Sequence, residues 1–151
     1  MARSNRQLTQ TAIEAVDLAL KWDGLLHGTI IAGNTEISSR DGGVQVKLFG
    51  KEILFLGFQA NRVVTVIVRS GDFHDSKGRP SRTTRERLNG LLDFLGDRGI
   101  IPEGTRVFLS PDGCRVGKGE QSQPLDKDNP MAPLLTSFKQ IPDSLIAKGL
   151  L

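Results

Sequence analysis

Residues 34–69 read NTEISSRDGGVQVKLFGKEILFLGFQANRVVTVIVR, and this stretch decides the fold. Near its start, the apolar residues Val44, Val46 and Leu48 alternate with polar ones. Alternation with a period of two residues is typical of a strand that buries one face and exposes the other. The stretch therefore predicts a sheet.

The turn before this strand indicates how it pairs. The dipeptide Asp41-Gly42 suits a tight type I′ turn, because both central residues of that turn need positive φ. Residues 34–39 should therefore pair with residues 43–49 in an antiparallel hairpin. Two more strands are expected after it, at residues 51–57 and 63–69. Together the four segments predict an antiparallel meander.

An amphipathic helix is expected at residues 83–95. Thr83 can cap its first turn, and Glu86 can complete a capping box. Gly96 or Gly99 can end it. Its leucines recur at the spacing of one helix face, at Leu88, Leu91, Leu92 and Leu95. This stripe should pack on the sheet.

An N-terminal helix is expected at residues 9–22, where Thr11 and Glu14 make a possible capping box. A closing hairpin is expected from residues 105–110 and 114–116, with Pro-Asp-Gly as its turn.

The predicted fold class is α+β. An antiparallel sheet of four to six strands carries one amphipathic helix, with an N-terminal helix and a short C-terminal helical tail added. Residues 1–118 form the domain, and its sheet and packed helix occupy residues 29–118. Residues 119–133 are polar and contain prolines, which predicts a linker, and residues 134–151 form the tail.

Composition sets limits on the class of protein. The chain has 151 residues, enough for one domain with its own core, and a net charge of +3, which permits nucleic-acid binding without demanding it. The single cysteine, Cys114, excludes an internal disulfide and is typical of a reducing compartment. No segment resembles a signal peptide or a membrane span. The expectation is a soluble protein of the cytoplasm.

Catalytic signatures are sparse. The sequence has no GxxxxGK[ST] loop, no GxGxxG after a strand, no HExxH and no GxSxG. The loop at residues 70–81 holds the weak catalytic candidates Asp72, His74 and Asp75, because carboxylates beside an imidazole raise its basicity and orient it. Loops are also rich in aspartate because it forms turns, and this interpretation is favoured over catalysis. No metal and no cofactor are expected.

A basic cluster spans the end of this loop and the start of the following helix. Its residues, with the neighbouring hydroxyls, are Lys77, Arg79, Arg82, Thr83, Thr84, Arg85 and Arg87. Arginines at a helix N-terminus oppose the helix dipole, so an anion such as a nucleic-acid phosphate would relieve the conflict. The alternative is a solvated face balanced by nearby acidic residues. Phe73 is the one aromatic side chain in this region that could stack a base.

The C-terminal tail is apolar at helical spacing. The residues concerned are Leu134, Leu135, Phe138, Ile141 and Leu145. A helix this short is not stable by itself. The tail therefore either packs back on the domain or docks on a partner protein.

Several motifs resemble a known group of sequences. They are an NT-containing first strand, a G-x-V-x-V-x-L-x-G second strand, and a T-T-[RK]-x-R-[LI]-N helix start, here Thr83, Thr84, Arg85, Arg87, Leu88 and Asn89. Over residues 33–116 the chain resembles small phage and prophage proteins of unassigned function. The resemblance implies a phage origin, hence a host-cell cytoplasm, and a compact sheet-plus-helix fold. The N-terminal helix, the long loop and the C-terminal tail depart from the pattern.

Three hypotheses of function follow. The leading one is a phage-encoded, non-enzymatic accessory protein that acts by binding, with nucleic acid slightly favoured as the partner through the basic cluster. The second is a protein-binding inhibitor of a host or defence factor, acting through the tail or the loop. The third is a hydrolase centred on Asp72, His74 and Asp75.

Overall fold

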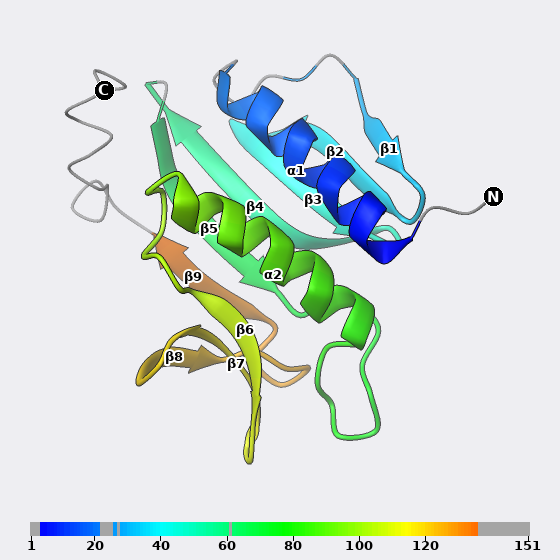
Figure 1. Cartoon of the computed structure of the whole chain (residues 1–151), viewed down its shortest axis with the longest axis vertical. Coiled ribbons are helices and arrows are strands. Elements are labelled where there is room, and N and C mark those ends of the chain that lie inside the picture. Colours follow the sequence, from blue (N-terminus) through cyan, green and yellow to red (C-terminus); the bar gives the residue numbers. More distant parts are fainter. Residues whose placement is uncertain (1–3, 22–25, 27, 61, 136–151) are drawn as a thin grey trace.

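The computed structural model of the chain describes residues 4–21, 26, 28–60 and 62–135, which form an α+β fold (Figure 1). In chain order, its helices and strands are α1 Asn5–Lys21, β1 Ile30–Ala32, β2 Thr35–Arg40, β3 Gly43–Leu48, β4 Lys51–Gln59, β5 Arg62–Arg69, α2 Arg82–Asp97, β6 Arg106–Ser110, β7 Gly113–Lys118, β8 Gln121–Pro124 and β9 Met131–Leu135. Among the described residues, no helix is long and apolar enough to cross a membrane.

The larger sheet has six antiparallel strands in the order β1-β2-β3-β4-β5-β9. Strands β2 to β5 form the meander that the sequence predicts. Asp41 and Gly42 have φ angles of 43° and 79°, as a type I′ turn requires. Phe49, expected as the last residue of a strand, lies instead in the next turn, with a φ of 52°.

Both helices cover one face of this sheet and run parallel to each other (Figure 1). Their contacts follow the same order along both helices, from Thr9 with Arg87 to Asp17 with Arg98. The core between helices and sheet includes the fully buried side chains of Val16, Ile37, Val44, Val46, Leu56, Leu88, Leu91, Leu92 and Leu95. The N-termini of both helices therefore lie at the same end of the sheet.

Helix α2 keeps the predicted leucine stripe but starts differently from the prediction. Its N-cap is Ser81, whose hydroxyl accepts a hydrogen bond from the backbone N–H of Thr84 at 3.3 Å. The expected capping box of Thr83 and Glu86 is therefore wrong. Glu86 pairs with Arg82 at 2.8 Å instead. Serine fills the cap position because its short hydroxyl reaches the free N–H groups of the first turn.

Helix α1 begins at Asn5, earlier than the predicted start at residue 9. Ser4 and Gln7 form a reciprocal capping box. The Ser4 hydroxyl accepts from the Gln7 N–H at 3.2 Å, and the Gln7 side chain accepts from the Ser4 N–H at 2.8 Å. The capping box expected at Thr11 is wrong, because Thr11 lies inside the helix and its hydroxyl donates to the Gln7 carbonyl at 3.1 Å.

Residues 119–133 are not an unstructured linker. They contain β8 and the start of β9, and Leu125 between these strands is fully buried. Strands β6, β7 and β8 form a three-stranded sheet, which contains the closing hairpin predicted from the sequence. Strand β9 then returns to the larger sheet and pairs with β5. The domain therefore continues through β9, and Leu134 and Leu135 belong to a strand rather than to a helical tail.

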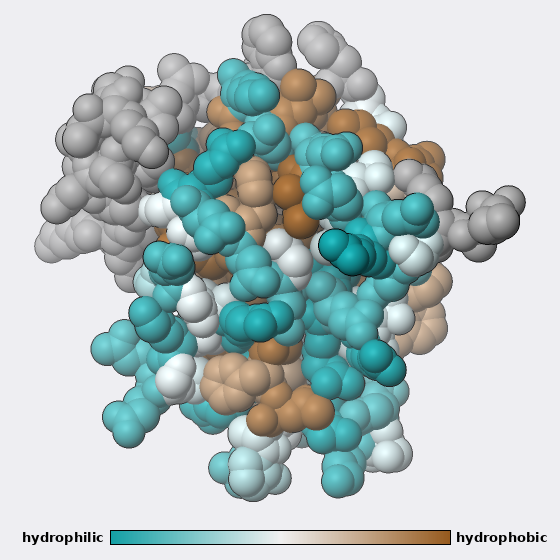
Figure 2. Space-filling view, in the orientation of Figure 1, coloured by the Kyte–Doolittle hydropathy of each residue, from teal (hydrophilic) through white to brown (hydrophobic). Residues whose placement is uncertain are grey.

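The face that carries the two helices is mainly hydrophilic (Figure 2). A smaller apolar area lies over β6 and β7, where Leu109 is 43% exposed.

Candidate functional site

Arg87 was predicted as part of a solvent-facing basic cluster, but its side chain is fully buried. Its Nε donates to Thr9 Oγ1 at 2.8 Å. One terminal nitrogen donates to Asn34 Oδ1 at 3.1 Å and to Thr35 Oγ1, and the other donates to Asn5 Oδ1. Desolvation lowers the pKa of Arg87. Arg87 therefore joins α1, α2 and the start of β2, and it is not exposed to an external anion.

Two motifs of the phage resemblance meet at this point. Asn34 and Thr35 are its NT pair, and both accept hydrogen bonds from Arg87 of its helix start. Asn89, the last residue of the helix motif, accepts from the Val107 N–H at 2.7 Å and donates to the Val107 carbonyl at 3.0 Å. These motif residues therefore have structural roles: they attach α2 to β2 and to β6.

Two more basic residues of the cluster have carboxylate partners. Arg79 pairs with Asp75 at 2.7 Å, and Arg82, whose side chain is 85% exposed, pairs with Glu86 at 2.8 Å. The hydrogen bond from Arg82 lowers the pKa of Glu86. These pairs reduce the positive charge that the sequence places here.

The remaining members of the cluster do not converge on one point. Arg85 donates through Nε to the Pro80 carbonyl at 3.1 Å, Thr84 is buried beneath the cap, and Thr83 is half-buried. Lys77 is exposed, and no ion pair joins it to another described residue. The geometry thus does not assemble the predicted anion site at the start of α2.

The three catalytic candidates of the loop form no hydrogen bond with one another in the part of the chain that the structure describes. The Asp75 carboxylate accepts from two backbone N–H groups of its own loop, at 2.9 and 3.0 Å. His74 Nε2 shares a hydrogen bond of 3.2 Å with Ser70 Oγ, and Asp72 is exposed. Among the described residues, no group of three or more His, Cys, Asp or Glu side chains could hold a metal ion.

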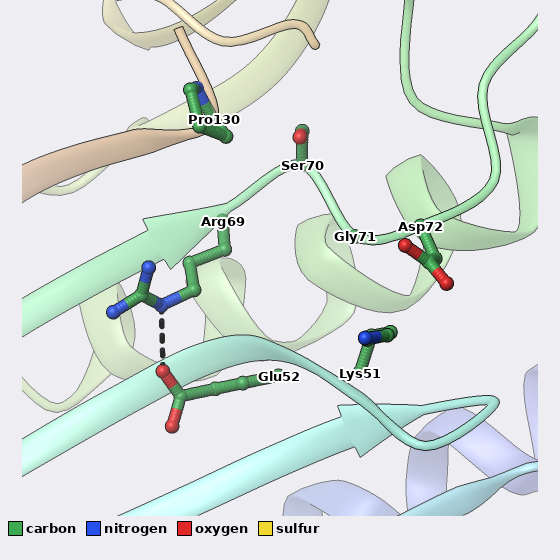
Figure 3. Close-up of a pocket in the computed structure, with 7 residues that line it drawn as sticks. All are labelled: Lys51, Glu52, Arg69, Ser70, Gly71, Asp72 and Pro130. Atoms are coloured by element: carbon green, nitrogen blue, oxygen red, sulfur yellow. Dashed lines mark hydrogen bonds and ion pairs between the residues drawn. The ribbon is translucent and has the colours of Figure 1, made fainter.

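A concavity of about 310 Å³ opens where β4 begins and β5 ends. Its lining residues are Lys51, Glu52, Arg69, Ser70, Gly71, Asp72 and Pro130 (Figure 3). Its walls come from β4, from the end of β5 with the loop that follows, and from the residue that precedes β9. Strands that are distant in sequence therefore build it together.

The lining of the concavity carries charges of both signs: Lys51 and Arg69 are cationic, and Glu52 and Asp72 are anionic. Glu52, only 12% exposed in its side chain, accepts from Arg40 Nε at 2.9 Å and from Arg69 Nε at 2.7 Å. The terminal nitrogens of Arg69 point away from Glu52 (Figure 3). Lys51 is exposed and forms no ion pair with any other residue that the structure describes. Glu52 thus binds two guanidinium groups, and Arg40 also pairs with Asp41 at 3.1 Å. Among the described residues, Lys51 and Asp72 are the charged lining residues that form no ion pair.

Beside the concavity lies an exposed aromatic pair. The rings of Phe49 and Phe73 meet edge to face, with centroids 5.0 Å apart and an interplanar angle of 70°. Each residue is 52% exposed. Phe49 precedes Lys51 by one turn residue, and Phe73 directly follows Asp72, so the pair adjoins the concavity. We name Phe49, Lys51, Arg69, Asp72 and Phe73 the sheet-end surface.

The backbone holds Phe73 in place. Ser70 donates its N–H to the Pro130 carbonyl at 2.9 Å, and the Ser81 N–H donates to the Phe73 carbonyl at 2.9 Å. Gly71 turns the chain with a φ of 76°, and a β-carbon there would lie 3.3 Å from the Ile53 side chain. The loop at residues 70–81 is therefore anchored at both ends, and these hydrogen bonds fix the position of Phe73.

The sequence did not identify Phe49 as a site residue. It follows an alternating strand, so the period of two continues through it, and its turn position becomes visible only from its φ of 52°. The available signal was the Phe49-Gly50 pair, where a type I′ turn would favour asparagine or aspartate in the first position.

Cys114 is buried at 1% exposure. Desolvation raises the pKa of its thiol to about 11, so the reactive thiolate is scarce at neutral pH. Leu134, offered from the sequence as a partner contact, is a half-buried residue of β9 that packs against the core. Phe138, Ile141 and Leu145 lie outside the described residues.

Comparison with known proteins adds no relative: no family model, no curated protein and no solved structure matches the chain.

Proposed function

We propose that this protein is a non-enzymatic accessory protein that binds single-stranded nucleic acid through the sheet-end surface. The proposal keeps the nucleic-acid ligand favoured by the sequence, but moves the contact from the start of α2 to the end of the sheet. There, exposed aromatic rings lie beside cations, the combination that binds single strands by base stacking and phosphate attraction.

The backbone of Phe49 is the observation that carries the proposal. A bulky side chain at positive φ costs roughly 1–2 kcal/mol relative to the right-handed conformation, and the φ of Phe49 is 52°. Its ring is half exposed, and it makes its edge-to-face contact with Phe73, which is equally exposed. Strain of this kind is concentrated at functional sites. A ring that stacks on a ligand would account for a phenylalanine at this turn.

The ring geometry favours an unpaired base. In an edge-to-face pair, one ring contributes only its edge to the contact, which leaves its own faces available for stacking. The bases of a duplex are already stacked on each other, whereas those of a single strand are free to stack on an aromatic side chain. Lys51 and Arg69 line the same concavity, so both can contact the phosphates of one strand.

A phage or prophage setting, with the host cytoplasm as the compartment, is the second part of the proposal. It rests on the motifs in which this chain resembles small phage proteins. Arg87 of the helix motif donates hydrogen bonds to Asn34 and Thr35 of the strand motif, so the two motifs hold the same part of the fold together. This contact supports the proposal that proteins with both motifs have the same fold.

The test is fluorescence anisotropy of a labelled mixed-sequence single-stranded oligonucleotide, and of its duplex, titrated with the full chain. We expect the single strand to bind more tightly and with salt sensitivity. Phe49→Asn or Phe73→Ala should each weaken binding by about 1–3 kcal/mol, roughly 5- to 150-fold. Lys51→Gln should reduce the slope of log affinity against log salt by about one.

The matched control is Leu18→Gln, which removes an apolar side chain of similar exposure, 43%, from α1. It should leave binding unchanged. The proposal fails if neither oligonucleotide binds, or if the phenylalanine variants bind as tightly as the original chain. Capture of a host protein that survives nuclease treatment and is lost in both phenylalanine variants would instead favour an inhibitor of a host factor.

A further inference from the structure

Asp72 is the member of the sheet-end surface that phosphate binding does not explain. It is exposed, lines the concavity and precedes Phe73 in the chain. Within the part of the chain that the structure describes, its carboxylate makes no hydrogen bond and no ion pair. The other acidic groups nearby are occupied, because Glu52 binds two arginines and Asp75 binds its own loop.

A carboxylate without a partner weakens the attraction of the site for a polyanion. Asp72 therefore opposes the contribution of Lys51 unless the ligand also brings a hydrogen-bond donor to it. Nucleobases differ in what they offer. Cytosine carries an exocyclic amino group, which donates well to a carboxylate, whereas thymine and uracil carry a carbonyl oxygen in the equivalent place.

We propose that Asp72 determines base preference: it accepts a hydrogen bond from the exocyclic amino group of a base stacked on Phe73, and it disfavours thymine and uracil. The inference rests on the proposed function. Asp72 directly precedes Phe73 in the chain, and its side chain points towards the concavity rather than into the loop (Figure 3). An ionised carboxylate has no donor for the carbonyl oxygen that thymine presents where cytosine has its amino group.

The experiment compares oligodeoxycytidine with oligothymidine of equal length, by anisotropy at fixed salt. Both bases are pyrimidines of similar size. They differ in the exocyclic group, in the hydrogen on N3 and in the C5 methyl group of thymine. The Asp72→Asn variant isolates the part of the preference that depends on the carboxylate. We expect the original chain to prefer the cytidine strand by about fivefold or more. Asp72→Asn should abolish that preference, because its amide donates to the thymine carbonyl and its lost charge raises affinity for both strands.

The control is Asp41→Asn, which removes one negative charge from an aspartate whose side chain is 83% exposed, in the β2–β3 turn. It should change both affinities by the same factor and keep their ratio. Equal binding of both strands by the original chain, or an unchanged ratio in Asp72→Asn, overturns the role of Asp72 and leaves single-strand binding intact. Failure to bind either strand overturns the proposed function and this inference with it.

Discussion

Arg87 Nε donates a hydrogen bond of 2.8 Å to Thr9 Oγ1, so a fully buried cation joins the N-terminal halves of both helices. The partners of its guanidinium are neutral oxygens from Asn5, Thr9, Asn34 and Thr35. A buried charge is tolerated when hydrogen bonds replace its water. This contact sets the relative position of α1, α2 and β2.

Replacing Arg87 should therefore destabilise the fold strongly. Arg87→Met keeps the length of the side chain but leaves the buried Thr35 hydroxyl and three half-buried side-chain oxygens without this donor, at a cost of about 3 kcal/mol in the free energy of unfolding. Urea denaturation measures the change. Arg82→Met is the control, since that side chain is 85% exposed and its loss should alter stability by no more than about 0.5 kcal/mol. Equal effects of the two changes would contradict the structural role of Arg87.

Asn89 should couple α2 to the small sheet. Asn89→Ala removes both hydrogen bonds to the Val107 backbone, and we expect a loss of about 1–2 kcal/mol with faster hydrogen exchange at the Val107 amide. Asn89→Asp retains the acceptor for that N–H and should preserve more of its protection than the alanine variant. If exchange at Val107 is the same in all three proteins, the coupling is absent.

Gly43 should tolerate no side chain. A β-carbon there would lie 2.2 Å from the Leu56 carbonyl oxygen and 2.7 Å from the Phe55 ring. Gly43→Ala should cost about 2 kcal/mol or more, because backbone must move. Gly42→Ala is the comparison, with no atom within 4 Å but a φ of 79°, and it should cost about 1 kcal/mol. Thermal unfolding that ranks Gly42→Ala as the more damaging change would contradict this account.

Phe49→Asn should stabilise the protein while it weakens ligand binding. Asparagine adopts positive φ readily, and Asn-Gly is the favoured pair for a type I′ turn, so a gain of about 0.5–1 kcal/mol is expected. Urea denaturation and the anisotropy titration, made on the same preparation, separate the two effects. Lower stability would show that the Phe49 ring supports the fold rather than a ligand.

Asp75 should make the loop sensitive to acid. The hydrogen bond from the Arg79 backbone N–H, with the other contacts of the carboxylate, lowers the Asp75 pKa below its ordinary value of 3.8. A lowered folded-state pKa stabilises the folded loop above the ordinary value, and this stabilisation is lost as pH falls through the folded-state pKa. The amide NMR signals of Lys77 and Arg79 should therefore titrate together with a midpoint below 3.8. Asp75→Asn should abolish this transition.

Local patterns account for the parts of the fold that were predicted correctly. The alternation at Val44, Val46 and Leu48 and the Asp41-Gly42 turn specify a hairpin whatever surrounds them. The leucine stripe of α2 likewise requires an apolar surface to cover it. The helix caps were predicted less accurately than the strands. Several residues with a hydroxyl group lie near the start of each helix, and only the path of the backbone decides which of them caps it.

The candidate site depends on contacts between distant segments, and for that reason the sequence did not reveal it. Phe49 meets Phe73 because the β3–β4 turn and the loop after β5 lie at the same end of the sheet. Strand β9 spans the boundary between the predicted polar linker and the predicted helical tail. The sequence did not reveal it, because its pairing with β5 uses backbone groups rather than a side-chain pattern.

The amino-acid sequence by itself determined the strands of the meander, their order and the apolar face of α2, since periodicity and turn chemistry act over a few neighbouring residues. Only the tertiary structure decided what each polar side chain does. Arg85 and Arg87 stand two positions apart on one helix, yet Arg87 is buried among neutral oxygens and Arg85 is not. The reason is that burial and charge pairing depend on which distant segments pack around a residue, and residue identity does not specify those neighbours.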